Sequence, residues 1–223
     1  MPQPWPRLEA PLRLGVMASG NGSNFEALVG ACRRGEVQAT VELLVVNHAD
    51  CGARARADRL GVPWRWIDHR AYANREDLDG ALIEAFQGAG VDLVVMAGWM
   101  RIVTPRLIGA FPDRLLNIHP SLLPSFRGLD AVGQALAAGV TITGCTVHVV
   151  RPEVDAGPIL VQAAVPVEAS DTPQSLAARI HRAEHRILPL AVVLAAQRLA
   201  KPSLMDKTAE GGGPDLGEGR PSD

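Results

Sequence analysis

Short apolar runs alternate with segments of helical spacing along most of the chain. Residues 12–18 form the first apolar run, a polar turn at 19–23 follows, and residues 24–34 carry apolar side chains at helical spacing. The same order returns with strands at 41–46 and 64–67 before helices at 53–60 and 75–86, and with further strands at 92–97 and 114–119. Such alternation predicts right-handed crossovers and an α/β fold, with a doubly wound, mostly parallel sheet and helices on both faces.

The pattern changes in the C-terminal third. After a helix at 128–138, two strands at 144–150 and 159–167 lie close enough in sequence to pair antiparallel at one edge of the sheet. A final helix should begin near Pro173, capped by Asp171 or Thr172. Its expected buried face comprises Leu176, Ile180, Ile187, Leu190 and Val193, and Pro189 should kink it.

Composition sets the domain boundaries. With 223 residues, 47% of them apolar, the chain can fill the core of one domain, which we place at residues 12–206. Residues 1–11 are proline-rich and are expected to be a flexible extension. Residues 207–223 hold five glycines, two prolines and no aromatic residue, so this tail is predicted to be disordered.

Charge and cysteine usage exclude several classes of protein. The formal net charge is −2 and the arginines are scattered, so no nucleic-acid partner is expected, whereas small anions can still bind. Cys32, Cys51 and Cys145 form no C-x-x-C motif, which favours reduced thiols. No apolar run reaches membrane-spanning length, so we expect a cytoplasmic protein with no membrane partner, either a monomer or a homodimer.

A glycine loop follows the first predicted strand, with the sequence Ser-Gly-Asn-Gly-Ser-Asn at 19–24. Its glycines permit a tight turn, and the helix behind it offers free N–H groups that suit a phosphate. The lysine of a P-loop is absent, and Phe25 stands where a dinucleotide fingerprint has its third glycine. Glu42 opens a strand instead of closing one, which argues against a nicotinamide dehydrogenase. A simple structural turn remains an alternative.

Asn117 and His119 stand two residues apart where a strand must end, because Pro120 cannot donate to a sheet ladder. Side chains at i and i+2 share one face, so the amide and the imidazole can address one developing oxyanion. Asp155 lies on a turn-rich loop, and a carboxylate beside His119 would favour its protonated form and hold its orientation. Ordinary structural roles, including a turn role for Asp155, remain alternatives.

A second motif, His-x-x-Glu-His at 181–185, matches an inverted zinc-peptidase signature on a predicted helix. Zinc needs a third protein ligand, and short patterns arise by chance, so no metal is expected. The simpler interpretation is a solvated helix face that includes Arg179, Arg182 and Arg186.

Four segments together resemble the phosphoribosylglycinamide formyltransferase family, the folate-dependent enzymes of purine synthesis. The resemblance covers about residues 12–200 and rests on the motifs at 19–24, 97–102, 117–124 and 155–158. The Asn-His-Pro-Ser motif is shared by folate formyltransferases and deformylases, whereas the glycine loop points to the enzyme that uses glycinamide ribonucleotide. The family fold and activity are therefore expected.

The resemblance also implies site residues. The catalytic group would be Asn117, His119 and Asp155, and the ribonucleotide would bind Gly22, Ser23, Asn24 and Glu184. The co-substrate 10-formyltetrahydrofolate would contact Arg75, Met100, Arg101, Ile102, Val103, Asn117, Arg151, Pro152, Glu153, Val154 and Asp155. Phe126, Arg127, Asp130 and Ala156 depart from the usual family residues.

The implied reaction moves a formyl group from the folate to the amine of 5-phosphoribosylglycinamide, with Asn117 and His119 stabilising the oxyanion. A 10-formyltetrahydrofolate deformylase, which gives the formyl group to water, is the closest alternative. A non-catalytic nucleotide-binding module is another.

Overall fold

Seven strands form one mixed sheet in the computed structural model, which describes residues 11–200. The strand order is β3-β2-β1-β4-β5-β6-β7. The strands are β1 (Leu12–Ala18), β2 (Ala39–Val46), β3 (Trp64–Trp66), β4 (Leu93–Met96), β5 (Leu115–His119), β6 (Ile142–Val149) and β7 (Ile159–Pro166). All pairs from β3 to β5 are parallel, and β6 pairs antiparallel with both β5 and β7. The predicted mostly parallel sheet with an antiparallel edge is confirmed.

Six α-helices and one 3₁₀ turn accompany the sheet within the described residues. They are α1 (Ser23–Arg33), α2 (Gly52–Leu60), η1 (His69–Ala71), α3 (Arg75–Gly88), α4 (Pro105–Ala110), α5 (Ala131–Ala137) and α6 (Pro173–Ala200). Neither α4 nor η1 was predicted. The predicted helix at 128–138 begins three residues late, because Asp130 adopts a left-handed conformation and caps α5 by accepting from the Gly133 N–H.

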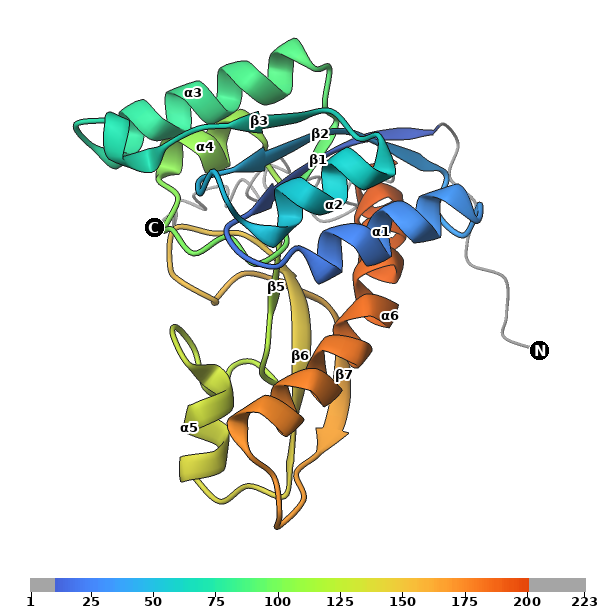
Figure 1. The fold of residues 1–223 in the computed structure, drawn as a ribbon, viewed down its shortest axis with the longest axis vertical. Coiled ribbons are helices and arrows are strands. Elements are labelled where there is room, and N and C mark those ends of the chain that lie inside the picture. Colours follow the sequence, from blue (N-terminus) through green and yellow to red (C-terminus); the bar gives the residue numbers. More distant parts are fainter. Residues whose placement is uncertain (1–10, 201–223) are drawn as a thin grey trace, which may run out of the picture.

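Helices cover both faces of the sheet (Figure 1). On one face, α1, α2 and α6 pack against the strands through side chains such as Leu28, Ala53 and Leu188. On the other, α3 and α4 contribute Leu82 and Leu107 to a second buried cluster. The strands between the two clusters are apolar on both sides, as expected of a parallel sheet buried on both faces.

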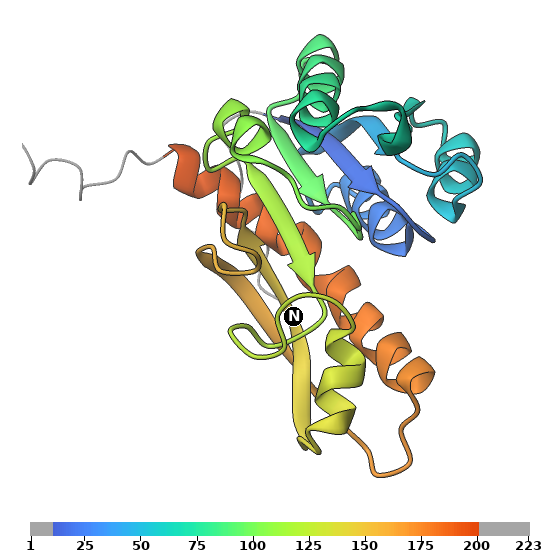
Figure 2. The same cartoon turned by 90° about the vertical axis from the view of Figure 1, so that its left-hand side faces the viewer.

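The last helix runs along the length of the molecule (Figure 2). It begins at Pro173, and the Thr172 hydroxyl accepts from the Ser175 N–H at 3.2 Å, which selects Thr172 from the two predicted caps. Four of the five predicted core side chains are buried and Leu190 is half-buried. Pro189 lies within the continuous helix; the kink predicted there stays a prediction.

The predicted domain of residues 12–206 is described as far as residue 200. The predicted flexible extension, apart from Pro11, and the predicted tail lie outside the described residues. No helix between residues 11 and 200 combines the length and the apolar character needed to cross a bilayer.

The strand order reverses at β1, which has β2 on one side and β4 on the other. In open α/β sheets ligands bind at such a switch point, beyond the carboxyl ends of the strands. The loops that leave β1, β4 and β5 at this edge begin at Ser19, Ala97 and Pro120. The fold thus brings the glycine loop, the 97–102 motif and the Asn-His pair to one end of the sheet.

Candidate active site

The glycine loop passes from β1 into α1 through Gly22, which has φ of 77° and precedes the first helical residue. No side chain caps this helix, so its first N–H groups stay available for a ligand. A neighbouring helix holds the loop: the Gly20 carbonyl accepts from the Ala53 N–H at 3.0 Å, and Arg56 Nε donates to the Asn21 carbonyl at 2.8 Å. The loop is thus preformed and open toward its helix N-terminus.

Substitution of Gly22 tests how tightly this turn is built. A Cβ there would lie 2.5 Å from Ala53 Cα, in addition to the cost of a positive φ. We expect Gly22→Ala to lower the free energy of unfolding by about 3 kcal/mol. Gly35→Ala is the matched control, because Gly35 has φ of 71° but no atom within 4 Å of the added Cβ; it should cost only about 1 kcal/mol. Urea denaturation measures the free energy of unfolding of both variants. Equal losses of stability would contradict the close packing of Gly22 against Ala53.

Asn117 and His119 project from the end of β5 into one polar cluster with Asp155. His119 Nδ1 lies 3.4 Å from Asp155 Oδ2, and Asn117 Nδ2 lies 3.4 Å from Asp155 Oδ1. His119 is 5% exposed and is one of the buried polar residues at this end of the sheet. The structure therefore brings together the three residues expected to be catalytic, although 36 residues of chain separate His119 from Asp155.

His148 joins this cluster and was not predicted. Its Nε2 lies 3.2 Å from Asn117 Nδ2 and 3.5 Å from Asp155 Oδ1, and its Nδ1 donates to the Val149 carbonyl at 3.0 Å. The position follows from the antiparallel register, which sets Asn117 opposite His148. Only the register of β5 against β6 could have revealed it, and the sequence does not specify that register.

The Asp155 loop fixes the carboxylate as an anion. Asp155 has φ of 52°, and its Oδ2 accepts from the Gly128 N–H at 2.9 Å. Burial works to raise the pKa of Asp155, but the hydrogen bond with His148, the Gly128 N–H and the nearby charge of His119 outweigh it. The pKa of this carboxyl therefore lies below its ordinary value.

The outer nitrogen of His119 is occupied by the protein itself. His119 Nε2 lies 2.8 Å from the carbonyl oxygen of Phe126, a residue with φ of 56°. The ring is thus held between a carboxylate on one side and a carbonyl on the other. A ligand oxygen that bonds to Nε2 must take the place of the Phe126 carbonyl.

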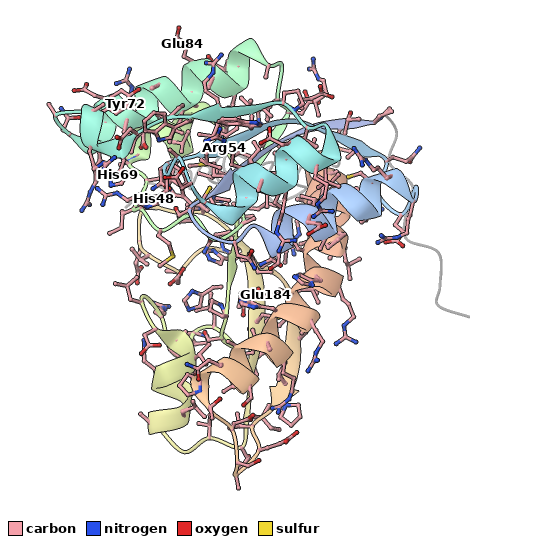
Figure 3. All side chains as sticks on the ribbon, in the orientation of Figure 1. His48, Arg54, His69, Tyr72, Glu84 and Glu184 are labelled. Carbon is pink, nitrogen blue, oxygen red and sulfur yellow. The ribbon has the colours of Figure 1, made fainter. Side chains whose placement is uncertain are left out.

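Asn24 and Glu184 link the glycine loop to the middle of α6, where Figure 3 labels Glu184. Asn24 Nδ2 donates to Glu184 Oε2 at 2.8 Å, while Asn24 Oδ1 is buried without a partner among the described residues. Burial raises the pKa of Glu184, opposed by the Asn24 hydrogen bond and by the charge of His181 and His119. A buried carboxyl whose pKa is raised by burial is typical of a functional site.

The raised pKa of Glu184 determines how this residue makes the stability of the fold depend on pH. The native state binds this proton more tightly than the unfolded chain, so stability falls as pH rises from the ordinary carboxyl pKa through the raised one. We expect Glu184→Gln to raise the melting temperature above that interval and to leave it unchanged below it. Thermal unfolding across the acid to neutral range measures this, with Glu153→Gln as the control because Glu153 is exposed. A constant difference at every pH would contradict the assignment.

A cavity of about 410 Å³ opens beside this polar cluster. Four of the eight large apolar side chains that are exposed in the described chain line it, namely Met100, Ile102, Leu129 and Val154. Exposed apolar side chains gathered around a few polar groups are typical of a site for an organic ligand.

Most of the predicted site residues line this cavity. They are Asn24, Met100, Arg101, Ile102, Val103, Asn117, His119, Arg151, Pro152, Val154, Asp155 and Glu184. Gly22 and Ser23 adjoin Asn24 in the glycine loop but are not in the lining, nor are Arg75 and Glu153. Arg75 begins α3, the helix next to the labelled Tyr72 in Figure 3, and Glu153 forms an ion pair of 2.9 Å with Arg127. His181 lines the cavity although it was singled out only for the zinc motif.

Grouping of metal-ligand side chains and the acidity of Cys145 bear on two other kinds of chemistry. Between residues 11 and 200 no three His, Cys, Asp or Glu side chains are grouped so as to hold a metal ion. Burial raises the pKa of the Cys145 thiol to about 12, and the three cysteines are free. A thiolate nucleophile is therefore not available from Cys145 near neutral pH.

Comparison with known proteins identifies the family. A family model described as formyl transferase matches residues 12–192. Over 177 residues the chain is 40% identical to the phosphoribosylglycinamide formyltransferase of Bacillus subtilis, covering 79% of this chain and 91% of that protein. The chain belongs to the phosphoribosylglycinamide formyltransferase family. Members are formyl-transferring enzymes, which agrees with the expectation from the motifs and not with the deformylase alternative.

Solved structures of the family share the fold. A glycinamide ribonucleotide transformylase from Symbiobacterium toebii superposes with a TM-score of 0.82 and 48% identity, covering 84% of this chain and 88% of that one. The human trifunctional purine biosynthetic protein adenosine-3 is 44% identical over 184 residues. The chain spans only 18% of that protein's length, so it corresponds to one part of it.

Proposed function

We propose that this protein transfers a formyl group from 10-formyltetrahydrofolate to the primary amine of 5-phosphoribosylglycinamide, a step of purine biosynthesis. The observation that carries the proposal is the cluster of Asn117, His119 and Asp155, which lines the same cavity as the apolar rim and Asn24 of the glycine loop. A folate requires an apolar slot and a phosphorylated amine requires an anion site. The lining of the cavity, which is mostly apolar and includes Asn24 of the glycine loop, supports the proposal.

In the proposed mechanism the substrate amine attacks the formyl carbon directly. A new C–N bond forms, the formyl oxygen takes up negative charge, and the bond from carbon to N10 of the folate then breaks. The amine loses one proton and N10 gains one, so no external acid or base is consumed. No side chain forms a covalent bond with the formyl group.

Asn117 and His119 would donate to the developing oxyanion. Asn117 Nδ2 would exchange its contact with His148 Nε2 or Asp155 Oδ1 for the substrate oxygen, and His119 Nε2 would exchange the Phe126 carbonyl. Asp155 remains ionised and stabilises positive charge on His119 as it forms. The carboxylate of Glu184 would accept a hydrogen bond from the substrate amine. Burial disfavours the anionic form of Glu184, and the amine would supply a partner for that form.

The two ends of the substrates have candidate partners as well. Gly22, Ser23 and Asn24 would hold the ribonucleotide phosphate at the start of α1. Met100, Ile102, Val103, Pro152 and Val154 would enclose the folate ring, and the cations Arg75, Arg101 and Arg151 are candidates for its carboxylates. Glu153, already paired with Arg127, would shape the same loop.

Release of tetrahydrofolate tests this function. Purified protein is supplied with 10-formyltetrahydrofolate, alone and together with glycinamide ribonucleotide, and absorbance follows the folate product. We expect release only when the ribonucleotide is present, and none with ribose 5-phosphate, which lacks the amine. Equal release without any acceptor would contradict the transferase proposal and favour the deformylase.

A further inference from the structure

Ser19 connects the two loops that we assign to different substrates. It is the first residue after β1 and only 8% exposed. Its N–H donates to the Gly98 carbonyl at 3.0 Å, and its Oγ accepts from the Met100 N–H at 2.9 Å. One residue at the start of the glycine loop thus makes two hydrogen bonds to the segment that lines the cavity.

The cavity segment is held at its other end by a different part of the fold. Asp79 on α3 is 1% exposed, and its Oδ2 accepts from the Thr104 N–H at 2.6 Å. Between these two anchors the side chains of Met100 and Ile102 are 63% and 51% exposed and stand at the cavity rim. The position of the rim therefore depends on Ser19 at one end and on Asp79 at the other.

The glycine loop rests on α2 through hydrogen bonds of Gly20 and Asn21, and no side chain caps the N–H groups at the start of α1. A phosphate bound at those groups would lie on the loop that begins with Ser19. The hydrogen bond from the Met100 N–H to Ser19 Oγ connects this loop directly to the cavity segment.

We propose that Ser19 is a positioning residue that couples the phosphate loop to the folate side of the cavity, so that each substrate strengthens binding of the other. The inference deepens the proposed function and rests on its assignment of the two subsites. A net contribution of about 0.5–1.5 kcal/mol for one hydrogen bond corresponds to a coupling of about 2- to 12-fold. Coupling between two ligands is reciprocal, so the same factor must appear whichever ligand binds first.

Calorimetric titration with two unreactive ligands measures this coupling. Tetrahydrofolate lacks the formyl group and ribose 5-phosphate lacks the amine, so neither ligand can react. In the unsubstituted protein, saturation with ribose 5-phosphate should tighten tetrahydrofolate binding by the factor above. In Ser19→Ala the factor should fall to about 1, since alanine keeps the backbone bond to Gly98 and removes only the Oγ acceptor.

Thr172→Ala is the matched control, because it removes a hydroxyl that accepts a backbone N–H at the start of α6, far along the chain from both loops. It should lower the melting temperature and leave the coupling factor unchanged. Equal coupling in Ser19→Ala and the unsubstituted protein, or no coupling in the latter, would overturn the proposal. The unsubstituted protein is also assayed for formyl transfer. If it is active but shows no coupling, only the role of Ser19 is refuted, whereas an inactive protein refutes the proposed function.

Discussion

His119→Asn is expected to lower the turnover number for formyl transfer by about 10²- to 10³-fold, the usual effect of removing one preorganised oxyanion donor. The imidazole lies between Asp155 and the Phe126 carbonyl, and an asparagine at this position is too short to reach both. Binding of the two substrates should change much less than turnover, because the glycine loop and the apolar rim remain. Steady-state kinetics with each substrate varied separates the two quantities.

A histidine outside the cluster provides the control for that substitution. His48 is exposed, and its ring contacts His69 at 5.5 Å between centroids, beyond the end of β2. We expect His48→Asn to leave turnover unchanged. A folded His119→Asn variant with the turnover of the unsubstituted protein would refute a role for His119 in the chemistry.

Asp155→Asn is expected to lower turnover by about 10²-fold or more, since the amide can still accept from the Gly128 N–H but cannot stabilise a positive His119. The depressed pKa of Asp155 adds a pH dependence. Because the native pKa lies below the unfolded one, the carboxylate stabilises the protein above the ordinary carboxyl pKa, and this contribution is lost as pH falls through the native value. The loss of stability on acidification should therefore be smaller in Asp155→Asn than in the unsubstituted protein.

Asp92→Asn separates catalysis from this stability effect. Asp92 Oδ1 accepts from Arg13 Nη2 at 2.9 Å at the opposite end of the sheet, and this side-chain hydrogen bond is the main cause of the lowered pKa of Asp92. Its substitution should change the acid stability without lowering turnover. If both carboxyl substitutions reduced turnover equally, the loss in Asp155→Asn would have to be attributed to folding.

Hydrophobic periodicity predicted most of the fold because the strands are buried on both faces and long helices repeat their apolar positions. It missed α4, whose six residues, Pro105–Ala110, are too few to establish a helical period. Its start is capped locally, because the Thr104 hydroxyl accepts from the Arg106 N–H and Pro105 is the first helical residue. The hydrogen bond from the Thr104 N–H to buried Asp79 is a tertiary contact that local sequence does not encode.

Only some members of the polar cluster could be predicted from the sequence. Asn117 and His119 share a strand face by their spacing, so two members follow from the sequence alone. Their contact with Asp155 was implied only by family resemblance, and His148 required the register of two antiparallel strands. The Phe126 carbonyl at His119 depends on a backbone with positive φ, which the side chain of phenylalanine does not favour.

The central claim is that the formyl carbon passes directly to the ribonucleotide amine. The most direct test supplies 10-formyltetrahydrofolate labelled with ¹³C in the formyl group, together with glycinamide ribonucleotide, and follows the label by NMR as the folate is consumed. We expect all of the label to appear as the formamide of the ribonucleotide, matching the tetrahydrofolate released. Label recovered as free formate, in proportion to the folate consumed, would contradict the claim.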